Sequence, residues 1–97
     1  MVEVVHNQEG RYSVTISSTT GNLLFESKPF SSEKEAKASL LKLKKDVVFE
    51  RKTNTNGKFM INLKTTDGVL IGQSELYSSE AGMENGIKNL QMGIQMP

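Results

Sequence analysis

Residues 21–33 read GNLLFESKPFSSE, and residues 68–80 read GVLIGQSELYSSE. In both stretches a glycine is followed by aliphatic residues, a serine, an aromatic residue and the sequence Ser-Ser-Glu, in the same order and at the same spacing. Gly21 and Gly68 are 47 positions apart. This correspondence indicates an internal repeat with a period near 47 residues.

The repeat extends over most of the chain. A shift of 47 positions aligns residues 2–43 with residues 49–90 without a gap. We predict one domain over residues 1–97, with repeat 1 at 2–45, repeat 2 at 49–93 and a connection at 46–48. Each copy alone lies near the limit of about 40 residues below which a chain rarely folds unaided, so the copies are expected to share one core.

Each copy has the pattern of three strands followed by a helix. Alternation of apolar and polar residues, as in Tyr12, Val14 and Ile16, predicts half-buried strands, and the glycines between the runs predict turns. The fold class is therefore α+β: two βββα units that form a single antiparallel sheet with both helices on one face. The expected strands are residues 2–5, 11–18 and 23–27 in the first copy, and 49–52, 58–65 and 69–74 in the second.

The helices are expected to begin at the paired serines. Ser32 followed by Glu35 is a capping box, in which the serine side chain accepts the backbone N–H three residues on. Apolar residues then recur at helical spacing and predict a stripe that packs on the sheet. Gly93 is expected to end the second helix. The stripe residues are Ala36, Leu40 and Leu43 in the first helix, and Met83, Ile87 and Leu90 in the second.

The second copy resembles the YegP-like family of small bacterial proteins. The resemblance lies in Gly57-Lys58-Phe59, Asp67-Gly68-Val69-Leu70-Ile71, Tyr77-Ser78-Ser79 and Asn85-Gly86-Ile87. The first copy departs from this pattern, because Ala38-Ser39-Leu40 stands where Asn-Gly-Ile is expected. The resemblance implies tandem β3α units with their helices exchanged between repeats. It implies no activity, because the function of the family is not established.

The composition is that of a soluble protein. The net charge is +1, and there is no cysteine, so neither a disulfide nor thiolate zinc ligation is expected. No basic segment followed by an apolar run opens the chain, and no apolar stretch approaches the length of a membrane span. We therefore expect a cytoplasmic protein with no membrane partner.

The sequence predicts no catalytic, cofactor or metal site. His6 is the only histidine, and it falls at the end of a strand, where a surface position is expected. Glu3 and Glu50 correspond across the repeat, but solvated carboxylates on an open sheet face do no acid–base work. The glycines occur singly at turns, without a phosphate-binding motif. The protein is predicted not to be an enzyme.

One cluster of basic residues supports an alternative function, weak nucleic-acid binding. A nucleic-acid surface combines cations with exposed aromatic residues for stacking. The aromatic residues here fall at core-type positions, so a nucleic-acid partner is not the favoured prediction. The basic cluster consists of Lys42, Lys44, Lys45, Arg51 and Lys52.

The favoured function is a non-catalytic structural or protein-interaction module whose partner is another protein or a second copy. Strand parity in the third strand of each copy assigns Leu23, Phe25 and Leu70 to the helix-covered face. The remaining apolar residues define a predicted interaction surface on the open face. A second alternative is small-ligand binding in a groove between the repeats. The predicted interaction surface consists of Val5, Leu24, Met60 and Ile71.

Overall fold

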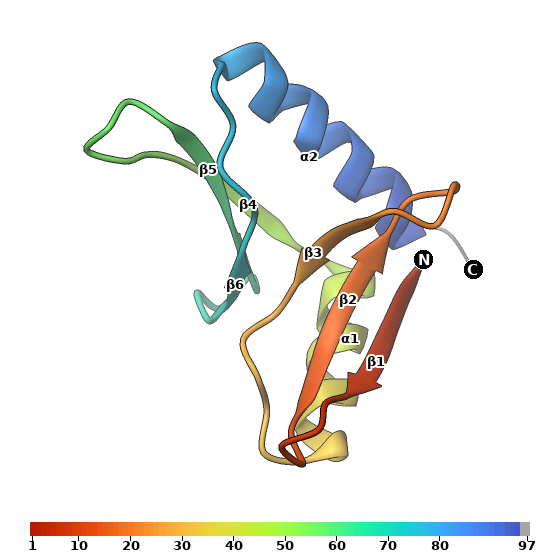
Figure 1. The fold of residues 1–97 in the computed structure, drawn as a ribbon. Coiled ribbons are helices and arrows are strands. Elements are labelled where there is room, and N and C mark those ends of the chain that lie inside the picture. The colour runs from red at the N-terminus through yellow and green to blue at the C-terminus, as the bar shows by residue number, and fades with distance from the viewer. Residues whose placement is uncertain (96–97) are drawn as a thin grey trace.

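The structure is a computed structural model that describes residues 1–95. Each copy forms three strands followed by one helix, so the predicted α+β class and the two βββα units are confirmed (Figure 1). The elements are β1 (Val2–His6), β2 (Tyr12–Ser17), β3 (Leu23–Glu26), α1 (Glu33–Lys45), β4 (Val48–Thr53), β5 (Phe59–Lys64), β6 (Leu70–Gln73) and α2 (Glu80–Gln95).

The turn after the first strand is built in the same way in both copies. Asn7 Oδ1 accepts hydrogen bonds from the backbone N–H groups of Glu9 (2.9 Å) and Arg11 (3.0 Å). Asn54 Oδ1 accepts the equivalent pair, both at 2.9 Å. Gly10 closes the first of these turns with φ of +77°, a conformation that glycine adopts without steric cost. The identical asparagines and glycines of the repeat are therefore explained by turn geometry.

The strands form two three-stranded antiparallel sheets, ordered β1-β2-β3 and β4-β5-β6. The prediction of a single sheet is therefore wrong. β3 and β6 lie next to each other, but only one backbone hydrogen bond joins the described residues there, from Lys28 N to Ile71 O (3.0 Å). The Phe25 ring stands against Gly72 between the two strands, where a Cβ on Gly72 would lie 2.8 Å from Phe25 Cζ. Since each strand has only four residues, this packing leaves the backbones in contact at one end only.

Phe25 and Gly72 occupy equivalent positions in the two copies and contact each other. Two equivalent residues can meet only near the axis that relates the copies. A phenylalanine at both positions would overfill this space, and a glycine at both would leave a cavity. One large and one small residue therefore fill the junction between the copies.

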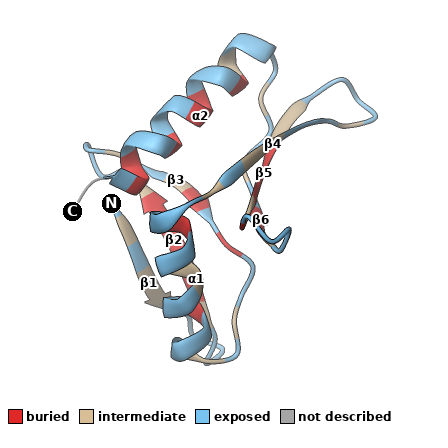
Figure 2. Ribbon diagram, turned by 180° about the vertical axis from the view of Figure 1, so that it is seen from behind, coloured by how far each residue is buried: buried red, intermediate tan, exposed pale blue. Residues whose placement is uncertain are grey.

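Both helices lie on the same side of β2, as the view from behind shows (Figure 2). α1 packs mainly on β1 and β2 of its own copy, whereas α2 packs on β5 of its own copy and on β2 and β3 of the other. The structure thus does not show the expected reciprocal exchange of helices. Instead, α2 packs on strands of both sheets, whereas α1 packs mainly on its own.

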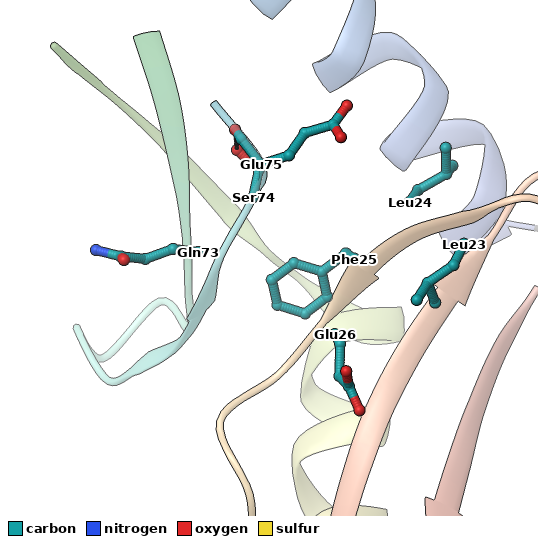
Figure 3. A pocket seen from close by; sticks show the side chains of 7 residues that line it. All are labelled: Leu23, Leu24, Phe25, Glu26, Gln73, Ser74 and Glu75. Carbon is teal, nitrogen blue, oxygen red and sulfur yellow. Dashed lines mark hydrogen bonds between the residues drawn. The ribbon is translucent and has the colours of Figure 1, made fainter. Parts of the chain in front are cut away.

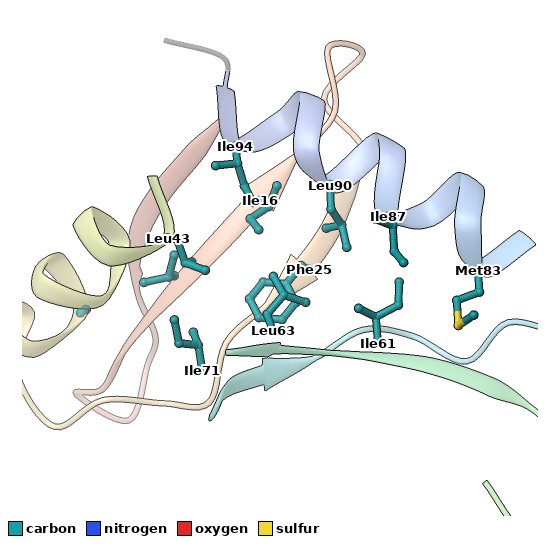
Figure 4. Close-up of a cluster of buried hydrophobic side chains, with 12 residues drawn as sticks. Ile16, Phe25, Leu43, Ile61, Leu63, Ile71, Met83, Ile87, Leu90 and Ile94 are labelled. Atoms are coloured by element: carbon teal, nitrogen blue, oxygen red, sulfur yellow. The ribbon is translucent and has the colours of Figure 1, made fainter. Parts of the chain in front are cut away.

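One cluster of buried apolar side chains extends across both copies (Figure 4). Val14 and Ile16 of β2, and Ile61 and Leu63 of β5, are completely inaccessible to solvent. The predicted helical stripe is confirmed, because the inner faces of both helices close over these strands. The remaining members of the cluster are Phe25, Ala36, Leu43, Ile71, Met83, Ile87, Leu90 and Ile94.

The helix starts follow the predicted capping pattern. Ser32 Oγ accepts the backbone N–H of Glu35 (3.2 Å), and Ser79 Oγ accepts that of Gly82 (3.0 Å). The Glu35 carboxylate accepts a hydrogen bond from the Ser31 hydroxyl at 3.3 Å. Both serines of the first pair therefore take part in starting α1.

The Asn-Gly-Ile motif of the second copy makes room for a tyrosine. A Cβ on Gly86 would lie 2.4 Å from Tyr77 Oη and 2.6 Å from Tyr77 Cζ. The first copy has Phe30 in place of Tyr77 and Ser39 in place of Gly86. The tyrosine hydroxyl is the atom that lies nearest to the position of a Cβ on Gly86. Phe30 has no hydroxyl group, so the first copy does not need a glycine at position 39 to make room for one.

Gly93 does not end the second helix, which continues to Gln95. A Cβ on Gly93 would lie 2.8 Å from Ile16 Cγ2 and 2.9 Å from the backbone oxygen of Ser17. The glycine lets α2 approach β2 of the other copy closely. Its role is helix–sheet contact rather than helix termination.

Replacing Gly93 with alanine is expected to lower the free energy of unfolding by about 1–3 kcal/mol. The overpacking outweighs the gain of about 1 kcal/mol that alanine brings to a helix interior, because the opposing Ser17 oxygen belongs to a paired strand. Gly82→Ala in the same helix is the matched control, since a Cβ there meets only Ser79 Oγ at 3.1 Å and other atoms at 4.0 Å. We expect Gly82→Ala to be neutral or stabilising in urea unfolding. Equal effects of the two substitutions would contradict the close approach at Gly93.

Candidate functional site

A groove of about 350 Å³ lies between β3 and the segment that follows β6 (Figure 3). It is formed by both copies, at the junction where the two sheets separate. Phe25 lies at its centre, and Leu23 and Leu24 lie to one side. This is the predicted groove between the repeats. Its lining residues are Leu23, Leu24, Phe25, Glu26, Gln73, Ser74 and Glu75.

An irregularity in strand pairing places Leu23 at the surface. Thr15 pairs with Glu26 and Ile16 with Phe25, but the register then shifts, so that Ser17 pairs with Leu23. Such a bulge places two residues of one strand opposite one residue of the other, and it reverses the face of every residue beyond it. Leu23 is consequently 62% exposed, whereas Phe25 is 3% exposed.

Two identical serines hold the third strands in place. Ser27 Oγ accepts the backbone N–H of Val14 (2.8 Å) and donates to Lys28 O (2.9 Å). Ser74 Oγ accepts the backbone N–H of Ile61 (2.9 Å) and donates to Glu75 O (2.9 Å). The side-chain hydroxyl replaces a backbone group at the end of each β-ladder, and it fixes the direction in which the chain enters the groove.

The groove carries negative charge. Glu26 and Glu75 lie on opposite sides of it, and no lysine or arginine is among the lining residues. Neither carboxylate forms an ion pair within residues 1–95. Gln73 points away from the opening. The site therefore combines an apolar floor with two carboxylates that have no cationic partner in the described part of the chain.

The predicted interaction surface does not exist as one patch. Ile71 is only 2% exposed and belongs to the core, and Leu24 is half-buried beside Gly93 of α2. The assignment of faces in the third strands was right for Phe25 but wrong for Leu23 and Ile71, because each strand carries a bulge that strict alternation ignores. Val5 and Met60 do lie on open sheet faces, opposite Ser13 and Lys52, and both are half-buried.

The basic cluster is divided among three places. Lys42, Lys44 and Lys45 are exposed at the C-terminal end of α1. Arg51 pairs with Ile61 on the helix-facing side of β4, whereas Lys52 pairs with Met60 on the open side. Lys52 Nζ lies 3.6 Å from Glu50 Oε1. The five cations therefore do not form one continuous surface.

Arg51 is bound to the second helix. Its Nη2 donates to Glu84 Oε1 (2.9 Å) and its Nε to Glu84 Oε2 (2.5 Å). The hydrogen bonds from this guanidinium lower the pKa of Glu84 below its usual value of 4.5. Both side chains remain about half-exposed, so the pair is screened by solvent.

This pair predicts a pH dependence of stability. The folded-state pKa of Glu84 is depressed, so its stabilising contribution is present above about pH 4.5 and is lost as the pH falls through the folded pKa. The urea midpoint of the wild type is expected to fall more between about pH 6 and about pH 3 than that of Glu84→Gln, which has no carboxylate to protonate. Identical pH dependences would show that the Arg51–Glu84 pair does not stabilise the fold.

The residues considered for catalysis do not converge. His6 is exposed and stacks on Tyr12, with ring centroids 4.6 Å apart. Glu3 and Glu50 lie on strands of different sheets, and Glu50 accepts hydrogen bonds from Asn62 (3.0 Å) and Lys64 (3.1 Å), which lower its pKa. Within residues 1–95, no three His, Cys, Asp or Glu side chains are close enough to hold a metal ion.

No helix within residues 1–95 combines the length and apolar character needed to cross a membrane.

Comparisons with known proteins agree with the geometry of the fold. Residues 54–92 match the model of a domain of unknown function, DUF1508. The UPF0339 protein SO3888 from Shewanella oneidensis has a solution NMR structure that is similar with a TM-score of 0.86, at 20% sequence identity over 98% of this chain and 84% of that chain. The protein of unknown function yegP from E. coli gives a TM-score of 0.82, at 22% identity over 98% of this chain and 85% of that chain. No curated protein sequence matches.

This chain has the fold of the YegP-like proteins. The tandem β3α units that the resemblance implied are thereby confirmed, whereas the exchange of helices is not shown. The domain match lies within the second copy, which carries Gly86 and Tyr77. Because both the domain and yegP are described as being of unknown function, the comparisons assign no activity.

Proposed function

We propose that this protein is a non-catalytic interaction module that contacts another protein, or a second copy of itself, through the groove between its repeats. The observation that carries the proposal is the exposure of Leu23 at a concave surface built by both copies. An exposed apolar side chain gives a partner apolar surface to bury, and the groove beside it gives a concave surface that the partner can fill. The groove also contains unpaired carboxylates that can select a partner by charge.

The open groove favours a protein partner over a small ligand. Small-molecule sites enclose most of the surface of their ligand and converge a few polar groups on it. Here the side chain of Gln73 points away from the opening, and Glu26 and Glu75 lie on its opposite sides. A nucleic-acid partner is disfavoured by the same two carboxylates, since phosphate contacts require cations.

Site-specific photo-crosslinking tests this proposal. A photoreactive amino acid is placed at Leu23, and at Leu41 as a matched control, because Leu41 is equally exposed (65%) on α1. In cells of the native organism, we expect a discrete crosslinked product from position 23 only, with its linkage mapped to one partner segment by mass spectrometry. Excess unlabelled wild type should compete with crosslinking, and the Leu23→Asp variant should not. No product from position 23, or equal products from both positions, would refute the proposal.

A further inference from the structure

β3 and β6 are joined by a backbone hydrogen bond at one end of their contact, and no backbone hydrogen bond joins the described residues at the other end. Lys28 N donates to Ile71 O. In the repeat, Lys28 corresponds to Glu75 and Leu24 corresponds to Ile71. The equivalent hydrogen bond would therefore run from Glu75 N to Leu24 O. No such bond is present within residues 1–95, and the groove lies at that place. The groove is therefore the unbonded half of a junction whose other half is closed.

The backbone of β3 has hydrogen-bonding groups that point into this open half. Ser27 N donates to Val14 O, so the backbone of Ser27 faces β2, while Lys28 N faces the second sheet. Alternation along the strand directs the N–H and C=O groups of Glu26 toward the groove as well. β3 is the end strand of its sheet, so no strand in the described part of the chain pairs with this edge. An unpaired edge is a template for a further strand.

The charge of the groove indicates which kind of strand fits. An added strand would lie beside the Glu26 and Glu75 carboxylates and above Leu23 and Phe25. Lysine or arginine side chains would complement the carboxylates, and apolar side chains would cover the floor. A second copy of β3 fits poorly, because the strand Leu23–Glu26 contains no basic residue to complement the carboxylates.

We propose that the groove binds an extended peptide segment with alternating basic and apolar residues, which adds to β3 as an edge strand. The proposal deepens the proposed function and rests on it. In this mode of recognition, main-chain hydrogen bonds supply affinity and alternate side chains supply specificity. The apolar residues of the peptide contact Phe25, and its basic residues pair with Glu26 and Glu75.

The probe is a short peptide of alternating lysine and valine, acetylated and amidated, titrated into ¹⁵N-labelled protein. We expect shifts of the amide signals of Leu24, Glu26 and Glu75, and roughly tenfold slower amide exchange at Glu26, because this N–H group gains a partner. Two further peptides carry N-methyl groups, one at every lysine and the other at every valine. Only one edge of the peptide faces β3, so one of these two should fail to bind. Equal binding of both would overturn strand addition.

Charge is tested separately. The double substitution Glu26→Gln and Glu75→Gln should weaken binding of the lysine–valine peptide by about fivefold or more, whereas Glu3→Gln with Glu9→Gln should leave it unchanged. A glutamate–valine peptide should not bind. Binding of that peptide, or equal weakening by both double variants, would overturn the assigned chemistry.

The two proposals fail in different ways. If crosslinking from Leu23 succeeds while no basic peptide binds, the interaction module stands and strand addition is wrong. If crosslinking fails, the module itself is refuted.

Discussion

Truncation of Phe25 to alanine is expected to lower the free energy of unfolding by about 3–5 kcal/mol. Phe25 is 3% exposed, and its ring fills the space between β3 and Gly72 of β6. The loss combines the burial of the ring with the cavity that remains at the junction of the two sheets. Urea unfolding followed by circular dichroism measures the effect. A loss below about 1 kcal/mol would mean that the junction does not depend on this ring.

A compensating substitution makes this prediction specific to the junction. Gly72→Leu alone should also destabilise the protein, because a Cβ at this position would meet Phe25 Cζ at 2.8 Å. In the double variant Phe25→Ala with Gly72→Leu, the leucine enters the vacated space, so the two losses should cancel in part, with a coupling energy of about 0.5–3 kcal/mol. Recovery should be incomplete, since the Cα of Ser27 is 3.0 Å from the same position. Strictly additive losses would show that the two residues do not share this space.

Truncation of Ile87 to alanine is expected to cost about 2–5 kcal/mol. Ile87 is 6% exposed on the inner face of α2, the helix that packs on strands of both sheets. The matched control is Leu41→Ala on α1, where the side chain is 65% exposed and the effect should stay within about 0.5 kcal/mol. Chemical denaturation of both variants gives the comparison. Similar losses in the two would contradict the placement of the core.

The repeat in the sequence was sufficient to predict the elements and most of the core. Turn asparagines, helix-start serines and apolar periodicity are local signals, and each acts within a few residues of its own position. Ser32 and the stripe residues Leu43 and Leu90 were therefore placed correctly.

The features that were missed depend on contacts distant in sequence. The bulges in β3 and β6 reverse strand parity, and no local signal marked them, so Leu23 was assigned to the buried face and Ile71 to the exposed one. The single sheet failed because Phe25 and Gly72 keep the strands apart, a contact between residues 47 positions apart. The substitution of phenylalanine by glycine at equivalent positions was a signal that could have marked the junction.

The identity of Ser27 and Ser74 was also a usable signal. Their hydroxyls bond to the backbone at the ends of the ladders. Glu26 and Glu75 were not singled out, because isolated carboxylates are common on surfaces. Only the fold brings them to opposite sides of one groove.

The central claim is that the two copies fold as one unit, with α2 and the Phe25–Gly72 contact joining the sheets. Residue-resolved urea unfolding by NMR tests it most directly. The amide signals of repeat 1 (2–45) and repeat 2 (49–93) are expected to disappear with one common midpoint, because neither copy buries enough apolar surface alone. Two separate midpoints, with one repeat remaining folded after the other has unfolded, would contradict the claim.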